Sequence, residues 1–114
     1  MTREIAWIGS SLKDFRKFPE AARREATRAL QIAANGETAD SAKAIKGLGV
    51  GVFEIALRYR TDAYRVVYAV QLGADIYVLH AFQKKSKTGI KTPKQDVDLM
   101  KARLKEVRRM LNDR

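Results

Sequence analysis

Three segments of alternating polarity, which follow one another between residues 52 and 82, constrain the fold more than any other feature of this chain. They cover residues 52–60, 64–70 and 75–82, and in each of them apolar or aromatic side chains return at every second position. A period of two places these side chains on one face of an extended strand and predicts half-buried antiparallel strands. The opposite face carries arginines, and a lysine-rich run follows the third segment. Together they predict a surface that holds a polyanion, with nucleic acid as the leading candidate.

The positive charge is concentrated near the C-terminal end. The net charge is +10, of which residues 83–114 carry +7 and residues 1–36 carry +3, while the segment between them is neutral. Such a distribution favours a partner that is a nucleic acid or an acidic protein. The alternative is a solvated basic surface that keeps the protein soluble.

Length and composition favour one globular domain spanning residues 1–114, because no repeat, linker or low-complexity segment divides the chain. The chain has no cysteine, which excludes disulfides, thiolate metal sites and cysteine nucleophiles. It shows no secretory h-region and no apolar stretch of transmembrane length, so a cytoplasmic protein without membrane contact is expected. No Asp, Glu and His cluster has metal-ligand spacing, and chemistry without metal or cofactor is expected.

The N-terminal third predicts a strand followed by two helices. Residues 5–8 form a short apolar strand, and Ser10 or Ser11 can cap the first helix. Pro19 restarts the helix, which continues to Ala34 with a stripe of alanines and one leucine and ends at Asn35 and Gly36.

The remaining segments complete a β-α-α-β-β-β-α order. Residues 37–51 predict a loop with one helical turn over Ser41–Ile45, and their glycines precede a strand, which is the wrong context for a phosphate-binding loop. Thr92 and Pro93 begin the last helix as its N-cap and first helical residue. Its apolar stripe consists of Val97, Met100, Leu104, Val107 and Leu111.

Five short sequence motifs, in their order along the chain, resemble those of the RelE/HigB superfamily of type II toxin–antitoxin toxins, in particular its phage-derived HigB-like branch. They are Lys13-Asp14-Phe15, the segment 52–58 (VFEIALR), the segment 64–68 (YRVVY), the segment 79–86 (LHAFQKKS) and Lys91-Thr92-Pro93. The resemblance implies an α+β RelE/ParE-like domain, with a small and mainly antiparallel sheet packed against an N-terminal helical hairpin and a C-terminal helix.

The resemblance also implies a function. Such a toxin is a metal-independent endoribonuclease, or mRNA interferase, that cleaves mRNA on the ribosome and thereby inhibits translation. Its implied partners are the ribosome with its mRNA and a cognate antitoxin, often a helix-turn-helix DNA-binding protein, in a hetero-oligomeric complex. The family's reaction is attack of a ribose 2′-OH on the adjacent phosphate, which requires a proton acceptor, a proton donor and cations.

Four residues match candidate catalytic positions. Arg65 matches the arginine that holds the phosphate, and Lys84, just beyond the predicted last strand, matches a basic residue that can protonate the leaving group. Arg58 either contacts phosphate or forms a salt bridge with Glu54. His80 is the only histidine and an acid–base candidate, but its strand parity with Ile76, Val78 and Phe82 favours a satisfied core histidine.

Further residues are candidates for RNA binding. Lys43 and Lys46 flank the loop before the sheet and either grip RNA or remain solvated. Lys85, Lys87 and Lys91 would attract the phosphate backbone. Tyr77 would stack on a base, whereas the tyrosines on the apolar faces of the first two strands are assigned to the core.

Two other functions share these features. A ParE-like toxin has the same fold but poisons DNA gyrase through protein contact, and a non-catalytic nucleic-acid-binding domain needs only the charge. Glu54 and Ala56 occupy positions where some ribosome-dependent members carry two lysines, so the general base stays open.

Overall fold

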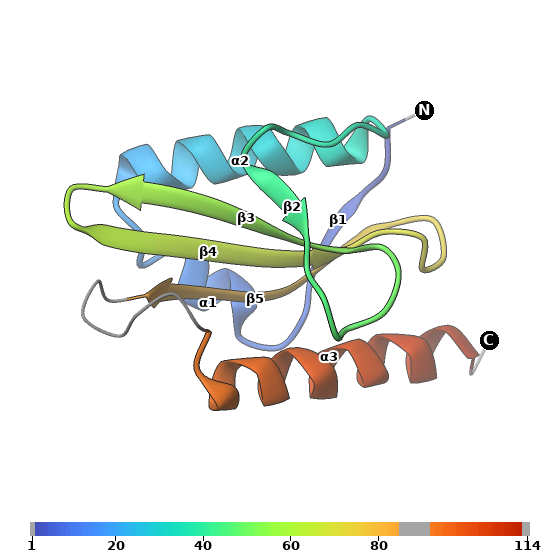
Figure 1. The fold of residues 1–114 in the computed structure, drawn as a ribbon. Helices are drawn as coiled ribbons and strands as arrows, with labels where there is room; N and C mark the ends of the chain where they lie inside the picture. The colour runs from blue at the N-terminus through green and yellow to red at the C-terminus, as the bar shows by residue number, and fades with distance from the viewer. Residues whose placement is uncertain (1, 85–91, 113–114) are drawn as a thin grey trace.

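The computed structural model describes residues 2–84 and 92–112, which form five strands and three helices (Figure 1). The elements are, in order, β1 (Ile5–Trp7), α1 (Ser11–Phe15), α2 (Glu20–Ala34), β2 (Ala42–Ala44), β3 (Val52–Tyr59), β4 (Asp62–Ala69), β5 (Ile76–Lys84) and α3 (Lys94–Asn112). The strands form one sheet in the order β1-β5-β4-β3-β2, in which β1 runs parallel to β5 and every other pair is antiparallel. The predicted α+β fold is therefore confirmed.

Helices cover both faces of the sheet, with α2 on one side and α3 on the other (Figure 1). On the α2 side, the predicted alanine stripe lets the helix approach the sheet closely, since alanine adds only a methyl group to the contact. The buried residues of this face include Ala26, Leu30, Ile55, Val66 and Tyr68. Aromatic rings extend this core, with Phe18 packed 4.9 Å, centroid to centroid, from Tyr64.

On the α3 side, a second apolar cluster joins the helix to the sheet. Met100, Leu104 and Val107 of the predicted stripe are buried against Val67 and Leu79. Both faces of β4 and β5 are therefore apolar over much of their length. Side chains that alternate along these strands point into the α2 core and the α3 core in turn, rather than into a core and into solvent.

The helical turn predicted over Ser41–Ile45 is wrong, because this segment contains β2. Ala42 pairs with Ile55 of β3, and the flanking backbone bonds run from Ala56 N to Ser41 O at 2.9 Å and from Ile45 N to Val52 O at 2.9 Å. One turn of helix gains few hydrogen bonds and is costly to nucleate. The unpaired edge of β3 offers the same backbone groups a better alternative, which only the assembled sheet provides.

A β-bulge interrupts the pairing of β4 with β5. Val67 lies opposite His80 and Tyr68 lies opposite Val78, so Leu79 is an extra residue on β5. Both Leu79 and His80 consequently face α3, and the parity of every later residue in β5 is reversed. The reversal is visible in the burial, since Ala81 packs in the α2 core and Phe82 packs against the α3 core.

Within residues 2–84 and 92–112, none of the helices is long and apolar enough to cross a membrane.

Helix α3 offers a matched pair of leucines that tests its packing. Leu104 is 3% exposed and Leu99 is 36% exposed. We expect Leu104→Ala to lower the free energy of unfolding by about 2–5 kcal/mol, because it leaves a cavity between helix and sheet. Leu99→Ala should change it by about 0.5 kcal/mol or less. Urea denaturation of both variants measures the difference, and equal losses would mean that α3 does not pack on the sheet through this stripe.

Candidate active site

The end of the sheet where β5 terminates carries a cationic face on the α3 side. The register places its side chains in three cross-strand rows, which are Lys43–Glu54–Val67–His80, Ala56–Arg65–Phe82 and Arg58–Ala63–Lys84. The apolar contacts of α3 lie toward the other end of the sheet, against residues such as Val52 and Ala69. Ala56 and Arg58 are exposed, so α3 leaves this end of β3 open to solvent.

Arg65 lies at the centre of this cationic face. Its Nη1 donates a hydrogen bond to Glu54 Oε1 at 3.2 Å, and the side chains are 24% and 20% exposed, respectively. Its Nε is buried and has no hydrogen-bond partner among the described residues. The carboxylate therefore holds the guanidinium in place, while the rest of the planar fork keeps donors that suit two oxygens of a phosphate.

Lys84 is the last residue of β5, whereas the sequence predicted it just beyond the end of this strand. It is only 6% exposed. Burial lowers the pKa of its ammonium group, and the positive charge of Arg65 lowers it further, while Glu54 acts in the opposite direction. An ammonium group with a lowered pKa releases its proton more readily than an ordinary lysine, which suits a general acid.

His80 lies on the same face as Arg65 and Lys84, not with Ile76 and Val78 as its position in the sequence indicated. The bulge at Leu79 causes this difference. The ring is 5% exposed, its Nε2 lies 2.7 Å from Asp96 Oδ1 in the first turn of α3, and Phe82 stacks on it at 4.8 Å. The histidine therefore lies in a core environment at the border of the cationic face, with its Nε2 hydrogen-bonded and its Nδ1 buried without a hydrogen-bond partner among the described residues.

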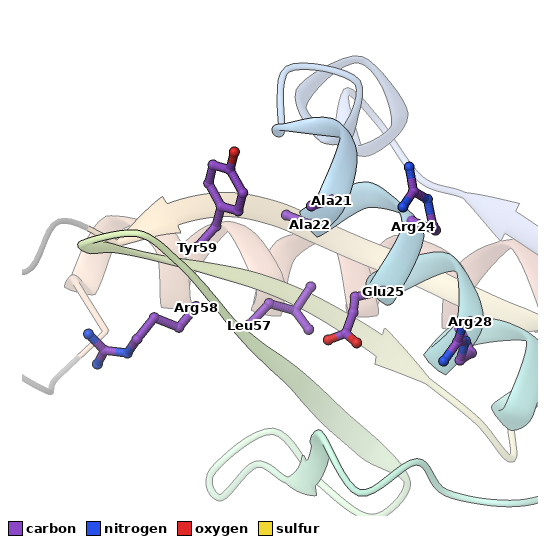
Figure 2. Close-up of a pocket in the computed structure, with 8 residues that line it drawn as sticks. All are labelled: Ala21, Ala22, Arg24, Glu25, Arg28, Leu57, Arg58 and Tyr59. Atoms are coloured by element: carbon purple, nitrogen blue, oxygen red, sulfur yellow. The ribbon is translucent and has the colours of Figure 1, made fainter.

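Arg58 does not form the alternative salt bridge with Glu54, since that carboxylate pairs with Arg65. Arg58 is exposed, and Figure 2 shows its guanidinium extending away from the residues of α2. A cavity of about 310 Å³ lies between α2 and β3, lined by residues that include Ala22, Glu25, Leu57 and Tyr59. Leu57 and Tyr59 face α2, so this cavity opens on the side of the sheet opposite Arg65 and Lys84.

The predicted RNA-binding residues fall into three groups. Lys43 is exposed and lies opposite Glu54 in the first row, and Lys46 is exposed in the turn that follows β2. Lys85, Lys87 and Lys91 lie outside the described residues. The stacking role predicted for Tyr77 is wrong, because its ring is 6% exposed in the core between the sheet and α3.

Two acidic residues belong to this region, although sequence reasoning did not assign them to it. Glu54 and Arg65 both lie on the polar faces of neighbouring strands. This shared alternation is the sequence signal that could have assigned Glu54 to the site. Asp96 gave no such signal, because a helix and a strand that are distant in sequence bring it to His80. Among the described residues, no three His, Cys, Asp or Glu side chains lie close enough to hold a metal ion.

Comparisons with known proteins find a matching family and a solved structure with a similar fold. Residues 13–105 match the family described as phage derived protein Gp49-like. In solved structures, the chain is similar to a double arginine-to-alanine mutant of the E. coli toxin RelE in the free state, with a TM-score of 0.62, 17% sequence identity, and coverage of 93% of this chain and 98% of the RelE chain. At that identity the likeness concerns the fold. No curated protein matches the sequence significantly.

The lowered pKa of Lys84 can be tested through its two causes. Arg65→Met removes the neighbouring charge but leaves the burial, so the pKa of Lys84 should rise only part of the way toward the ordinary lysine value of about 10.4. NMR titration of lysines labelled by reductive methylation measures it, with exposed Lys43 as the internal reference. A pKa that stayed unchanged in Arg65→Met would mean that the two cations do not interact.

Proposed function

The chain belongs to the family of phage-derived Gp49-like proteins, and we propose that it is the toxin of a type II toxin–antitoxin system that cleaves mRNA on the ribosome. Family membership and the RelE fold confirm the resemblance to the RelE/HigB superfamily. The nuclease activity is our proposal, and the arrangement of three side chains supports it.

The observation that carries the proposal is the grouping of Arg65, Glu54 and Lys84 on an open sheet face. A fixed guanidinium, a carboxylate that contacts it and an ammonium group with a lowered pKa supply the three functions that phosphodiester cleavage by a 2′-OH needs. The residues come from three adjacent strands, so the sheet fixes their relative positions before RNA binds. Such preorganisation favours the transition state over the ground state.

The proposed reaction forms one bond and breaks another at a single phosphorus atom. The ribose 2′-oxygen bonds to phosphorus as the bond to the 5′-oxygen of the next nucleotide breaks, which gives a 2′,3′-cyclic phosphate and a 5′-OH. Arg65 donates to the non-bridging oxygens, whose negative charge increases in the transition state. Lys84 gives its proton to the departing 5′-oxygen.

Glu54 is the proposed acceptor of the 2′-OH proton. It is the acidic member of the rows that form the cationic face, and it occupies a position where some ribosome-dependent members carry a lysine. Its neighbour on this face, Ala56, is small and exposed, which leaves space for a ribose beside the carboxylate. A carboxylate can accept the proton directly, so the chemistry does not require the missing lysines.

Other residues would bind and position the substrate. Arg58 and Lys43 border the face and would contact neighbouring phosphates, with Lys46 beyond them. His80 would act mainly through position, because its Nε2 is occupied by Asp96 and its ring supports Phe82. A cognate antitoxin would neutralise the toxin by covering this face or α3, and its own helix-turn-helix domain would bind DNA.

Replacement of Arg65 tests the proposed function most directly. We expect Arg65→Ala to lower the rate of cleavage of ribosome-bound mRNA by about 10²- to 10³-fold, because it removes a contact that strengthens in the transition state. Growth inhibition on induced expression should be lost with it. Mapping of new mRNA 5′ ends, together with single-turnover cleavage on purified ribosomes, measures both effects.

The matched control is Arg24→Ala, which removes an exposed arginine of α2 whose contact in the structure is with Glu20. It should keep parental cleavage. Parental cleavage by a folded Arg65→Ala protein would contradict the assignment of this site. Growth inhibition that survives in Arg65→Ala with inhibition of gyrase supercoiling would instead support the ParE-like alternative.

Amide hydrogen exchange tests the proposed antitoxin contact. Binding of the antitoxin should slow exchange in β3, β4 and α3, because covering the cationic face or the helix excludes water from them. Gel filtration of co-expressed proteins establishes the complex first. If protection appeared only in α2, the inhibitor would act from the opposite face, and the covering of the active site would be wrong.

A further inference from the structure

The carbonyl of Leu79, the extra residue of the β5 bulge, is bound by a side chain of α3, while the carbonyl of the preceding Val78 is bound from the N-terminal segment. Val78 O accepts the backbone N–H of Ile8 at 3.0 Å and the hydroxyl of Ser11, which is 0% exposed, at 3.1 Å. Arg103 of α3 donates through Nη1 to the carbonyl of Leu79, the extra residue itself, at 2.8 Å. A buried carbonyl without a partner is unfavourable, so the contact from Arg103 stabilises the bulged register over a regular one.

Arg103 also connects α3 to the N-terminal segment. Its Nη2 donates to Ser10 Oγ at 2.9 Å, and Ser10 in turn donates to Asp14 Oδ2 at 3.0 Å. The guanidinium lies directly over Gly9, where a Cβ atom would come within 2.8 Å of Arg103 Nε. Gly9 has a φ of +57°, so both its backbone conformation and this close approach favour glycine. Leu79, Ser10 and Gly9 thus surround the guanidinium of Arg103.

The register that this arginine stabilises decides which face Lys84 occupies. Side chains alternate in a strand, so removing the bulge by a one-residue slip would move each residue after Leu79 to the other face. Lys84 and Phe82 would leave the row positions beside Arg65, and His80 would leave Asp96. Glu54 and Arg65, which lie on β3 and β4, would keep their places.

We propose that Arg103 is a positioning residue of the active site, which acts from α3 by holding the β5 bulge and thereby keeps Lys84 beside Arg65. This inference rests on the proposed function for its catalytic consequence, but the register of β5 can be measured without it. Arg103 does not lie in the three rows of the cationic face, so its effect on cleavage passes through β5.

Three substitutions separate positioning from charge. Arg103→Met removes the hydrogen bonds and keeps an unbranched apolar stem, Arg103→Lys keeps one cationic donor, and Lys105→Met removes an equal charge from an exposed position of the same helix. The full-length protein is used throughout. Arg103→Gln, which removes the guanidinium and keeps a neutral polar side chain, serves as a milder variant if Arg103→Met does not fold.

The first measurement is the register, by cross-strand NMR contacts between β4 and β5. In the parent and in Lys105→Met, His80 should lie opposite Val67. In Arg103→Met this contact should weaken or be replaced by one from a shifted register, and the pKa of Lys84 should rise as it leaves Arg65. Arg103→Lys should restore the parental contact at least in part.

The second measurement is cleavage of ribosome-bound mRNA. Arg103→Met should lower kcat by about tenfold or more, because the proposed proton donor Lys84 is displaced. Its KM should stay within about threefold of the Lys105→Met value, because both variants lose one positive charge and RNA binding depends on charge. Arg103→Met should cause little further loss in a Lys84→Met background, since residues that act through one another are not additive. Arg103→Lys should recover part of kcat.

Two results would overturn the proposal. One is a folded Arg103→Met or Arg103→Gln protein with the parental register and kcat, and the other is full additivity of Arg103→Met with Lys84→Met. Absence of cleavage by the parent protein would contradict the proposed function instead. In that case the NMR register in Arg103→Met would still decide whether this arginine positions Lys84.

Discussion

The pairing of β4 with β5 is the interaction on which the rest of this structure depends. These strands lie at the centre of the sheet, and the two apolar cores pack on their opposite faces. The extra residue Leu79 divides β5 into two parts with opposite parity. Before it, Tyr77 contributes to the α3 core, and after it Phe82 and Lys84 share a face with Arg65. One bulge thus permits a single strand to serve first a core and then a charged site.

Helix α3 limits the extent of that site. Its buried stripe covers the end of the sheet where β5 begins, and its first turn reaches the row of His80 through Asp96. Beyond this row none of the described helices covers this face of the strands, and Arg58 is exposed. The same helix supplies Arg103, which binds the carbonyl of Leu79 in the bulge. Helix α3 therefore covers one end of the sheet and also contacts the bulge that sets the faces of the later residues of β5.

Charge balance within the cationic face explains why it can exist in a folded protein. Arg65 and Lys84 are close enough for the arginine to lower the pKa of the lysine, and burial adds to this effect. Glu54 offsets part of the repulsion by its contact with Arg65. Removing this carboxylate would break the ion pair of the partly buried Arg65, which is unfavourable to folding. The acidic residue therefore has a structural reason to be present beside its proposed role as a base.

The sequence by itself determined four of the five strands, the helices and the fold family, because these follow from periodicity, capping residues and short motifs that do not depend on distant partners. The alanine stripe of α2 and the apolar stripe of α3 were both found in this way, as were Arg65 and Lys84 by their match to family positions. Tertiary structure alone decided β2, which forms on the edge of β3. It also decided the buried place of Tyr77 and the side of the sheet on which His80 lies. A bulge resets side-chain parity without changing the residues around it, and the carbonyl of its extra residue is bound by Arg103, which is distant in sequence. For this reason the alternation in β5 predicted a strand correctly and predicted the face of His80 wrongly.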